Sequence, residues 1–210
     1  IEYVKLLEKD MLKRGVKIHT GSLVQGVRRT PAGVEIRTFS DEWKKFDSVV
    51  MASHSDQSLK MLENPSDEEV KLLSAIKYQK NQAYLHSDTI VMPKRKRCWS
   101  SWVYASDELD NSNPVGVSYW MNRLQPISGD ENFFQSLNPN REIKQELIYD
   151  QKTFMHPVFD REALSAQEKF NTIQGRNNTW YCGAWLRNGF HEDGYSSAVD
   201  ILENIGMVSV

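Results

Sequence analysis

The sequence predicts a mixed α/β fold, and two stretches carry this prediction. Residues 46–53 (FDSVVMAS) contain four consecutive apolar residues, which is typical of a strand buried on both faces of a parallel sheet. Residues 179–182 (TWYC) are predicted to form a second strand, which runs through a glycine-bearing loop into a helix with apolar residues at i, i+3, i+4 and i+7. In open α/β sheets, ligands bind at such strand–loop–helix junctions.

The other elements follow from periodicity and turn residues. Residues 1–14 place apolar side chains on one helical face, and Gly15 is a typical helix stop. Another helix is expected to begin at Ser66, whose spacing to Glu69 matches a capping box. A loop-rich stretch covers residues 122–144. Further strands are predicted over residues 16–27, 34–38, 83–92, 99–105 and 115–121.

Composition argues against several classes of protein. The 210 residues carry 26 Lys and Arg against 28 Asp and Glu, and the pI of about 6.3 argues against a dedicated nucleic-acid-binding protein. No apolar run reaches the ~18–20 residues of a membrane span. Two cysteines, Cys98 and Cys182, are too few for a disulfide scaffold, so a cytoplasmic location is predicted. The start at Ile1 rather than Met favours a piece of a longer chain.

The start of the last helix is a candidate binding site. Free backbone N–H groups and the helix dipole favour a partly negative ligand there. Glu192 and Asp193 lie at the same place, and each would repel a phosphate by about 1 kcal/mol or more at close range in water. A flavin suits the site better, because its N1–C2=O edge gains negative charge on reduction. The alternative is that Asp193 simply caps the helix, and both roles can hold together.

The stretch over residues 181–206, YCGAWLRNGFHEDGYSSAVDILENIG, closely resembles the C-terminal flavin fingerprint of the flavin-containing amine oxidase superfamily. Its GFHEDG loop is similar to the bacterial and plant amine oxidoreductase (NAD/FAD-binding) subgroup. Residues 49–62 (VVMASHSDQSLKML), 99–104 (WSSWVY) and 156–160 (HPVFD) are similar to the same subgroup. The resemblance implies the two-domain amine-oxidase-like flavoprotein fold and an FAD-dependent oxidoreductase that removes a hydride from a C–N or C–C bond.

The resemblance also implies which residues contact FAD. Val24 would meet the adenine ring through its backbone, and Gly183 would lie beside the ribityl chain or the pyrophosphate. Phe190 would form an aromatic wall that faces the substrate, and His191 is the candidate proton relay. Ala184 stands where many members have an acid. The full set implied to bind the cofactor is Val24, Gly183, Ala184, Phe190, His191, Glu192, Asp193 and Gly194.

The chain departs from the family pattern in two respects. It contains no strand–GxGxxG–helix unit, so it corresponds to the C-terminal portion of such a flavoprotein, and we expect it to be inactive alone. Many amine oxidases place a lysine near flavin N5. The corresponding stretch of this chain is residues 80–83, and no lysine there aligns with the family position. The resemblance implies that residues 1–58 and 172–210 belong to an FAD-binding domain and residues 59–171 to a substrate-binding domain.

The same resemblance gives expectations for substrate and partners. Members of the subgroup are often linked or fused to cyclopropane fatty-acid synthases, so the substrate is expected to be a small molecule or a lipid acyl chain. The alternative is a non-catalytic accessory domain on a flavoprotein fold that binds a lipid-modifying enzyme.

Two further patterns have a structural and a functional interpretation. The pairs His54–Asp56 and His86–Asp88 have short spacing, but there is no HExxH or CxxC, so we favour hydrogen-bonded structural roles and predict no metal site. The run Lys94-Arg95-Lys96-Arg97, followed by Trp99, is either a solvated turn or a peripheral membrane contact.

Overall fold

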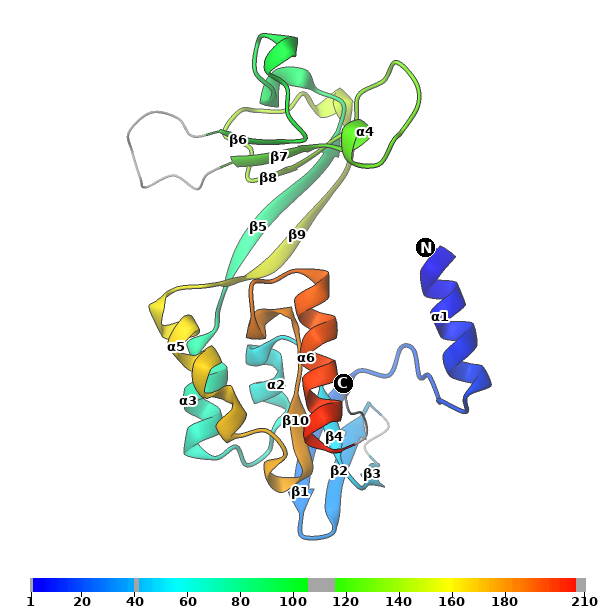
Figure 1. The fold of residues 1–210 in the computed structure, drawn as a ribbon, viewed down its shortest axis with the longest axis vertical. Coiled ribbons are helices and arrows are strands. Elements are labelled where there is room, and N and C mark those ends of the chain that lie inside the picture. Colours follow the sequence, from blue (N-terminus) through cyan, green and yellow to red (C-terminus); the bar gives the residue numbers. More distant parts are fainter. Residues whose placement is uncertain (1, 40–41, 106–115, 207–210) are drawn as a thin grey trace. The chain divides into compact units, whose positions relative to one another are not determined.

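The computed structural model describes residues 2–39, 42–105 and 116–206, and the chain divides into two compact units (Figure 1). The first unit comprises residues 1–77 and 159–210, and the second comprises residues 78–158. Residues 59–77 and 159–171 therefore lie in the first unit, whereas the sequence prediction placed them in a substrate-binding domain. The functional roles of the two predicted domains stay predictions.

The first unit holds two small sheets and most of the helices. Its elements are α1 (Glu2–Lys13), β1 (Val24–Thr30), β2 (Gly33–Thr38), β3 (Trp43–Phe46), β4 (Val49–Met51), α2 (Ser55–Met61), α3 (Asp67–Ala75), α5 (Arg161–Lys169), β10 (Thr179–Tyr181) and α6 (His191–Asn204). Strands β1, β2 and β3 form an antiparallel meander, and β10 pairs with β4 in parallel. The predicted α/β class is confirmed, and the strand predicted within residues 46–53 lies in a parallel sheet, as expected.

Two strand predictions in this unit are corrected. The strand expected over residues 16–27 begins only at Val24, because a turn at Thr20 and Gly21, whose φ is +65°, interrupts the extended chain. Residues 46–53 were expected to be buried on both faces, but Val50 is 48% exposed. Among the described residues the parallel sheet has only two strands, and the side chain of Val50 lines an open cavity.

Helix packing forms the core of the first unit. Ser66 and Glu69 form the predicted capping box: the Ser66 hydroxyl accepts from the Glu69 N–H at 3.3 Å, and Glu69 accepts from the Ser66 N–H at 2.7 Å. Helix α1 confirms the predicted first helix, but none of its residues is buried. Seven of the buried apolar residues come from α3, α5 and the segments that follow them: Leu72, Leu73, Ile76, Ala163, Ala166, Phe170 and Ile173.

The second unit is built on a five-stranded sheet with the order β6-β7-β8-β5-β9. One face packs on the core cluster of Val91, Met92, Phe134 and Ile143. Its elements are β5 (Lys77–His86), three short 3-10 helices η1 (Thr89–Val91), η2 (Lys96–Cys98) and η3 (Gln145–Leu147), β6 (Trp102–Ala105), β7 (Gly116–Trp120), α4 (Met121–Leu124), β8 (Phe134–Leu137) and β9 (Ile148–Val158).

Three expectations for this unit need adjustment. The strand predicted over 83–92 ends at His86, and η1 occupies part of the remainder. The strand predicted over 99–105 begins only at Trp102, and residue 115 of the strand predicted over 115–121 lies outside the described residues. The loop-rich stretch 122–144 contains the central strand β8, which is only four residues long and therefore too short to show a clear alternation. No helix among the described residues is long and apolar enough to cross a membrane.

Candidate functional site

The carboxyl ends of β4 and β10 lie at the same end of the parallel pair, because Thr179 pairs with Val49 and Tyr181 with Met51. We call this end of the pair, together with the loops that leave it, the edge. The chain continues from β4 into Ser53 and from β10 into Gly183. The indole N–H of Trp185 donates a 3.1 Å hydrogen bond to the Ser53 carbonyl. The two loops that leave this edge are therefore tied to each other.

Gly183 is required where the chain leaves β10. Its φ is +154°, and a Cβ at this position would lie 2.5 Å from Nε1 of Trp185. The Gly183 N–H donates to the Ser197 hydroxyl at 3.0 Å, and that hydroxyl donates to the Gly194 carbonyl at 2.8 Å. This relay fixes the loop after β10 against the first turns of α6.

The start of α6 exposes the predicted flavin-facing residues side by side. The carboxylate of Asp193 accepts a 2.9 Å hydrogen bond from the Phe190 N–H, so Asp193 contributes to the cap, as the alternative interpretation expected. The first N–H groups of the helix, from His191 onwards, have no acceptor in a preceding turn. Phe190 is 64% exposed, and His191 and Glu192 are exposed as well. No hydrogen bond to the imidazole of His191 occurs among the described residues.

Gly194 and Ala184 lie against each other behind this surface. A Cβ on Gly194 would lie 3.6 Å from the Ala184 nitrogen, which is ordinary van der Waals contact. The structure thus brings Gly183, Ala184 and residues 190–194 into one place, where sequence spacing alone suggested only a strand followed by a helix.

Val24 lines a separate cavity of about 780 Å³ at the other side of the β4 loop. Its lining is mainly apolar and includes Ile36, Val50 and Met61. Ser53 lines the cavity too, and its carbonyl is the acceptor for Trp185. The cavity and the start of α6 therefore belong to one edge of the first unit, with the Ser53–Trp185 bond between them.

The residues at this edge fit two parts of FAD and not a third. The apolar cavity suits an aromatic ring, and the N–H groups at the start of α6 suit a carbonyl-bearing ring edge. The sequence contains no GxGxxG motif, which in the dinucleotide-binding fold holds the pyrophosphate at the start of a helix.

A buried polar network supports β10 from the side of α3. The Tyr181 hydroxyl donates to Oε1 of Glu69 at 2.7 Å, and Nη1 of Arg29 lies 2.5 Å from the same oxygen. Burial raises the pKa of Glu69, but hydrogen bonds from Ser66, Arg29 and Tyr181 together leave it below the usual value. Burial, and then the Glu69 carboxylate, raise the pKa of Tyr181 far above its usual value.

Sequence reasoning missed the residues that hold this edge together: Ser53, Trp185, Ser197, Arg29 and Tyr181. The only sequence signal was the position of Ser197, three residues after Gly194 and thus on the same helical face. The thiol of Cys182, also beside the edge, is buried, and burial raises its pKa.

The His86–Asp88 pair and the basic run at residues 94–97 lie in the second unit, outside this edge, whereas His54 and Asp56 follow Ser53 at the start of α2. His86 is fully buried, its Nε2 lies 2.9 Å from the Ser136 hydroxyl, and burial lowers its pKa. Asp88 accepts hydrogen bonds from the N–H groups of Ile90 and Lys144. No group of three or more His, Cys, Asp or Glu side chains that could hold a metal occurs among the described residues.

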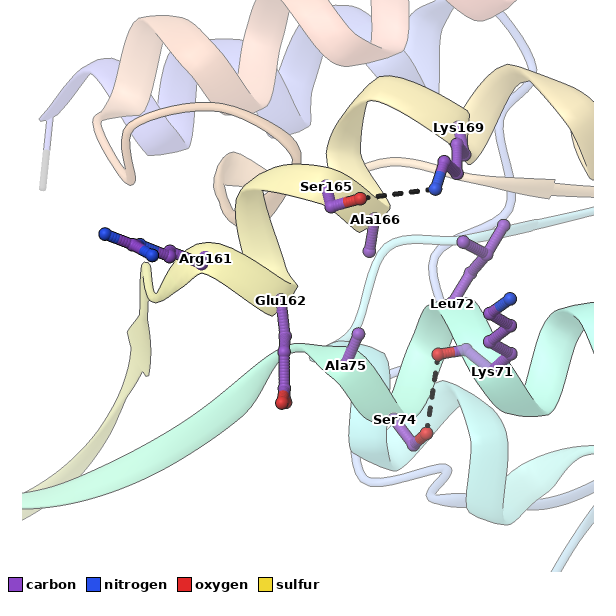
Figure 2. A pocket seen from close by; sticks show the side chains of 9 residues that line it. All are labelled: Lys71, Leu72, Ser74, Ala75, Arg161, Glu162, Ser165, Ala166 and Lys169. Atoms are coloured by element: carbon purple, nitrogen blue, oxygen red, sulfur yellow. Dashed lines mark hydrogen bonds between the residues drawn. The ribbon is translucent and has the colours of Figure 1, made fainter.

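A second cavity of about 480 Å³ lies between α3 and α5 (Figure 2). Leu72, Ala75 and Ala166 line it, and Lys71 and Lys169 flank it from the two helices, with the Lys169 ammonium donating to the Ser165 hydroxyl at 3.3 Å. None of the predicted site residues lines this cavity.

Comparison with known proteins identifies the fold. No family model matches the sequence, and no curated protein matches it. A solved CLA-producing fatty acid isomerase from P. acnes is 17% identical, with a TM-score of 0.58 over 87% of this chain and 47% of that chain. Reduced UDP-galactopyranose mutase is 10% identical, with a TM-score of 0.63 over 94% of this chain and 50% of that one.

Wild-type putrescine oxidase bound to putrescine is 11% identical, with a TM-score of 0.61 over 98% of this chain and 53% of the oxidase. The chain spans about half the length of these solved structures. At such identities the likeness shows the fold alone, which is that of the C-terminal portion of the amine-oxidase-like flavoproteins.

Proposed function

We propose that this chain supplies the flavin-facing and substrate-facing part of an FAD-dependent oxidoreductase of the amine-oxidase-like type. The observation that carries the proposal is the single edge on which the Val24 cavity and the start of α6 are joined through the Ser53–Trp185 hydrogen bond. An extended cofactor with an aromatic ring at each end needs two such sites at a fixed separation.

Each predicted residue has a part in this proposal. Val24 and the apolar wall around Val50 hold the adenine ring. Gly183 and Ala184 allow the ribityl chain or the pyrophosphate of the cofactor to approach the protein backbone, since Gly183 has no side chain and Ala184 has a small one. The N–H groups of residues 191–193 donate to the carbonyl-bearing edge of the isoalloxazine, with Gly194 keeping the first helical turn close to Ala184. When bound, FAD supplies the acceptor for a hydride.

The exposed side chains at the start of α6 face the substrate in this proposal. Phe190 provides an aromatic wall, and its large exposed fraction leaves the ring available for contact. His191 accepts a proton from the substrate at a ring nitrogen, which its exposed position permits. Glu192 and Asp193 keep free phosphate away from the N–H groups.

Exposed apolar side chains on one sheet face of the second unit favour an apolar substrate. Trp102 pairs with Tyr119, Tyr119 with Gln135, and Gln135 with Leu85, so these side chains share one face of the sheet. On that face Trp102 is 48% exposed and Leu85 is 40% exposed, opposite the face that covers the core. A lipid acyl chain or an amine with an apolar body fits such a face, and one structural neighbour is a fatty acid isomerase. A cyclopropane fatty-acid synthase-like enzyme is the proposed functional partner.

FAD titration of the purified chain tests the proposal. Binding is followed by the flavin absorption band near ~450 nm and by flavin fluorescence. Val50→Asp places a charge in the Val24 cavity, and Val70→Asp makes the same change at a valine of similar exposure on α3, outside that cavity. We expect Val50→Asp to weaken FAD binding at least ~10-fold, or about 1.4 kcal/mol, and Val70→Asp to leave it unchanged.

Absence of any binding up to about 1 mM FAD, equivalent to only ~4 kcal/mol, both by this chain and by a longer form of the protein that carries a strand–GxGxxG–helix unit, would contradict the cofactor assignment. The accessory-domain alternative would then be tested by binding of the chain to a lipid-modifying enzyme without any flavin.

A further inference from the structure

One end of the five-stranded sheet collects two loops of the second unit. His86 at the end of β5 and Trp120 at the end of β7 both pair with Phe134 at the start of β8. The loop from β5 to β6 (residues 87–101) and the loop from β7 to β8 (residues 121–133) therefore leave the sheet at the same end, which we call the loop end.

The loop end carries the most basic segment of the chain. Lys94, Arg95, Lys96 and Arg97 are consecutive and all exposed. None of the four forms an ion pair with any carboxylate of the described part of the chain. Arg123 in the other loop is exposed as well, and Arg141 adds a further exposed cation, because its guanidinium donates a 2.7 Å hydrogen bond to the Ile90 carbonyl.

The basic segment is held on a fixed scaffold. Its 3-10 helix is closed by bonds from the Cys98 N–H to the Arg95 carbonyl at 2.8 Å and from the Trp99 N–H to the Lys96 carbonyl at 3.1 Å. The indole N–H of Trp99 donates to the Pro93 carbonyl at 2.8 Å, and this hydrogen bond connects the two ends of the segment. Trp99 also packs edge-on against Trp120, with ring centroids 5.2 Å apart, so the segment is anchored in the core.

Apolar side chains accompany the cations. Ile90 on η1 is 44% exposed, and Leu124 and Ile127 in the other loop are 42% and 38% exposed. The carboxylates of these loops oppose the cations only in part. Asp88 is buried and accepts hydrogen bonds from two backbone N–H groups, and Glu131 accepts one from the Tyr149 hydroxyl, while Asp130 is exposed.

We infer that the loop end docks onto the surface of an anionic lipid bilayer. Consecutive cations without a carboxylate partner among the described residues match a surface with many negative headgroups, although Lys96 also lies 5.7 Å from the Trp99 ring centroid. Exposed aliphatic side chains match the boundary between headgroups and acyl chains. A discrete phosphate needs donors that converge on one point, whereas consecutive exposed cations beside exposed apolar side chains present an extended surface. The net charge of −2 for the whole chain argues against a nucleic acid as the partner.

Vesicle co-sedimentation of the full chain tests this inference. Vesicles of phosphatidylcholine alone are compared with vesicles that also contain phosphatidylglycerol, at low and at high NaCl. We expect binding only to the phosphatidylglycerol vesicles, with loss of binding as salt rises, since the attraction is screened. The combined variant Lys94→Gln, Arg95→Gln, Lys96→Gln and Arg97→Gln is expected to bind at least ~100-fold more weakly.

A matched control removes the same charge elsewhere. Lys17, Lys44, Lys45 and Lys80 are all exposed and form no ion pair among the described residues, so changing these four to Gln should leave vesicle binding within about threefold of the wild type. Circular dichroism melting checks that both variants remain folded. Ile90→Ser should weaken binding to phosphatidylglycerol vesicles without changing the salt dependence.

Three results would overturn the inference. The first is equal binding to both kinds of vesicle, or no binding to either at low salt. The second is equal binding by the basic-segment variant and the control variant. The third is release from vesicles by inorganic phosphate that exceeds release by NaCl at the same ionic strength, because that would show a discrete phosphate site. FAD affinity is measured in parallel, and none of these results depends on it.

Discussion

The hydroxyl of Tyr181 on β10 donates a 2.7 Å hydrogen bond to the carboxylate of Glu69 on α3, and both residues are buried. The same oxygen of Glu69 faces the guanidinium of Arg29 on β1. One carboxylate thus connects the antiparallel meander, a helix and the parallel pair that carries the candidate site. Because a buried charge without its partner is strongly unfavourable, removing one partner of this contact should destabilise the first unit.

Glu69→Gln should destabilise the chain by about 3–5 kcal/mol, because the buried guanidinium of Arg29 loses its counter-charge. Tyr181→Phe should cost about 1.5–3 kcal/mol, the range for a hydrogen bond to a charged group. The measurement is chemical denaturation followed by circular dichroism. Glu68→Gln is the control, since Glu68 is the neighbouring carboxylate on α3 and pairs with Arg176 in solvent. An effect of Glu68→Gln as large as that of Glu69→Gln would contradict the assignment.

The stability of the chain should fall in acid in a way that depends on Glu69. The net pKa of Glu69 lies below its usual value in the folded protein, so the unfolded chain binds the proton more tightly. The contribution of Glu69 is therefore complete above the unfolded-state pKa of 4.5 and is lost as the pH falls through the folded-state pKa. The difference in unfolding free energy between wild type and Glu69→Gln should shrink between neutral and strongly acidic pH. A constant difference would contradict this.

His86 should make the second unit sensitive to mild acid. Burial lowers the pKa of this imidazole below 6.5, so the folded state holds it neutral while the unfolded chain takes up a proton. The contribution of His86 to the free energy of unfolding is complete above pH 6.5 and declines as the pH falls below that value. An NMR titration of the His86 imidazole signals is the direct measurement. Titration of His86 at or above pH 6.5 would contradict the prediction.

Two glycine-to-alanine changes at the candidate site should have opposite effects on stability. Gly183→Ala places a Cβ 2.5 Å from the Trp185 indole at a φ of +154°, so we expect a loss of about 1–3 kcal/mol and a change in Trp fluorescence. Gly194→Ala meets only an ordinary contact at 3.6 Å inside a helix and should be neutral or stabilise by up to ~1 kcal/mol. Thermal unfolding of both variants separates the two cases. Destabilisation by both to the same extent would show that the loop after β10 is not constrained as described.

Local patterns predicted much of the fold. The capping box at Ser66, the strands at residues 49–51 and 179–181 and the final helix all follow from local patterns, whereas the parallel pairing of these two strands does not. Strand β8 was missed because a four-residue strand gives too little alternation to count, and its burial comes from neighbours distant in sequence.

The candidate site was predicted only in its contiguous part. Residues 190–194 are adjacent in sequence, so their shared location follows directly. The Ser53–Trp185 bond joins residues 132 positions apart, and the buried Glu69–Tyr181 bond joins residues 112 apart. Such partners are selected by the packing of α3, β4 and β10, which a single sequence does not encode in any local pattern.

The Ser53–Trp185 hydrogen bond makes one indole proton a reporter for both halves of the edge. Its acceptor belongs to the wall of the Val24 cavity, and its donor lies over Gly183 beside α6. A ligand that shifts either loop must lengthen or shorten this one bond. Solvent exchange of the Trp185 indole N–H therefore registers occupancy at either end, and a ligand that spans both ends should slow it more than two separate fragments do.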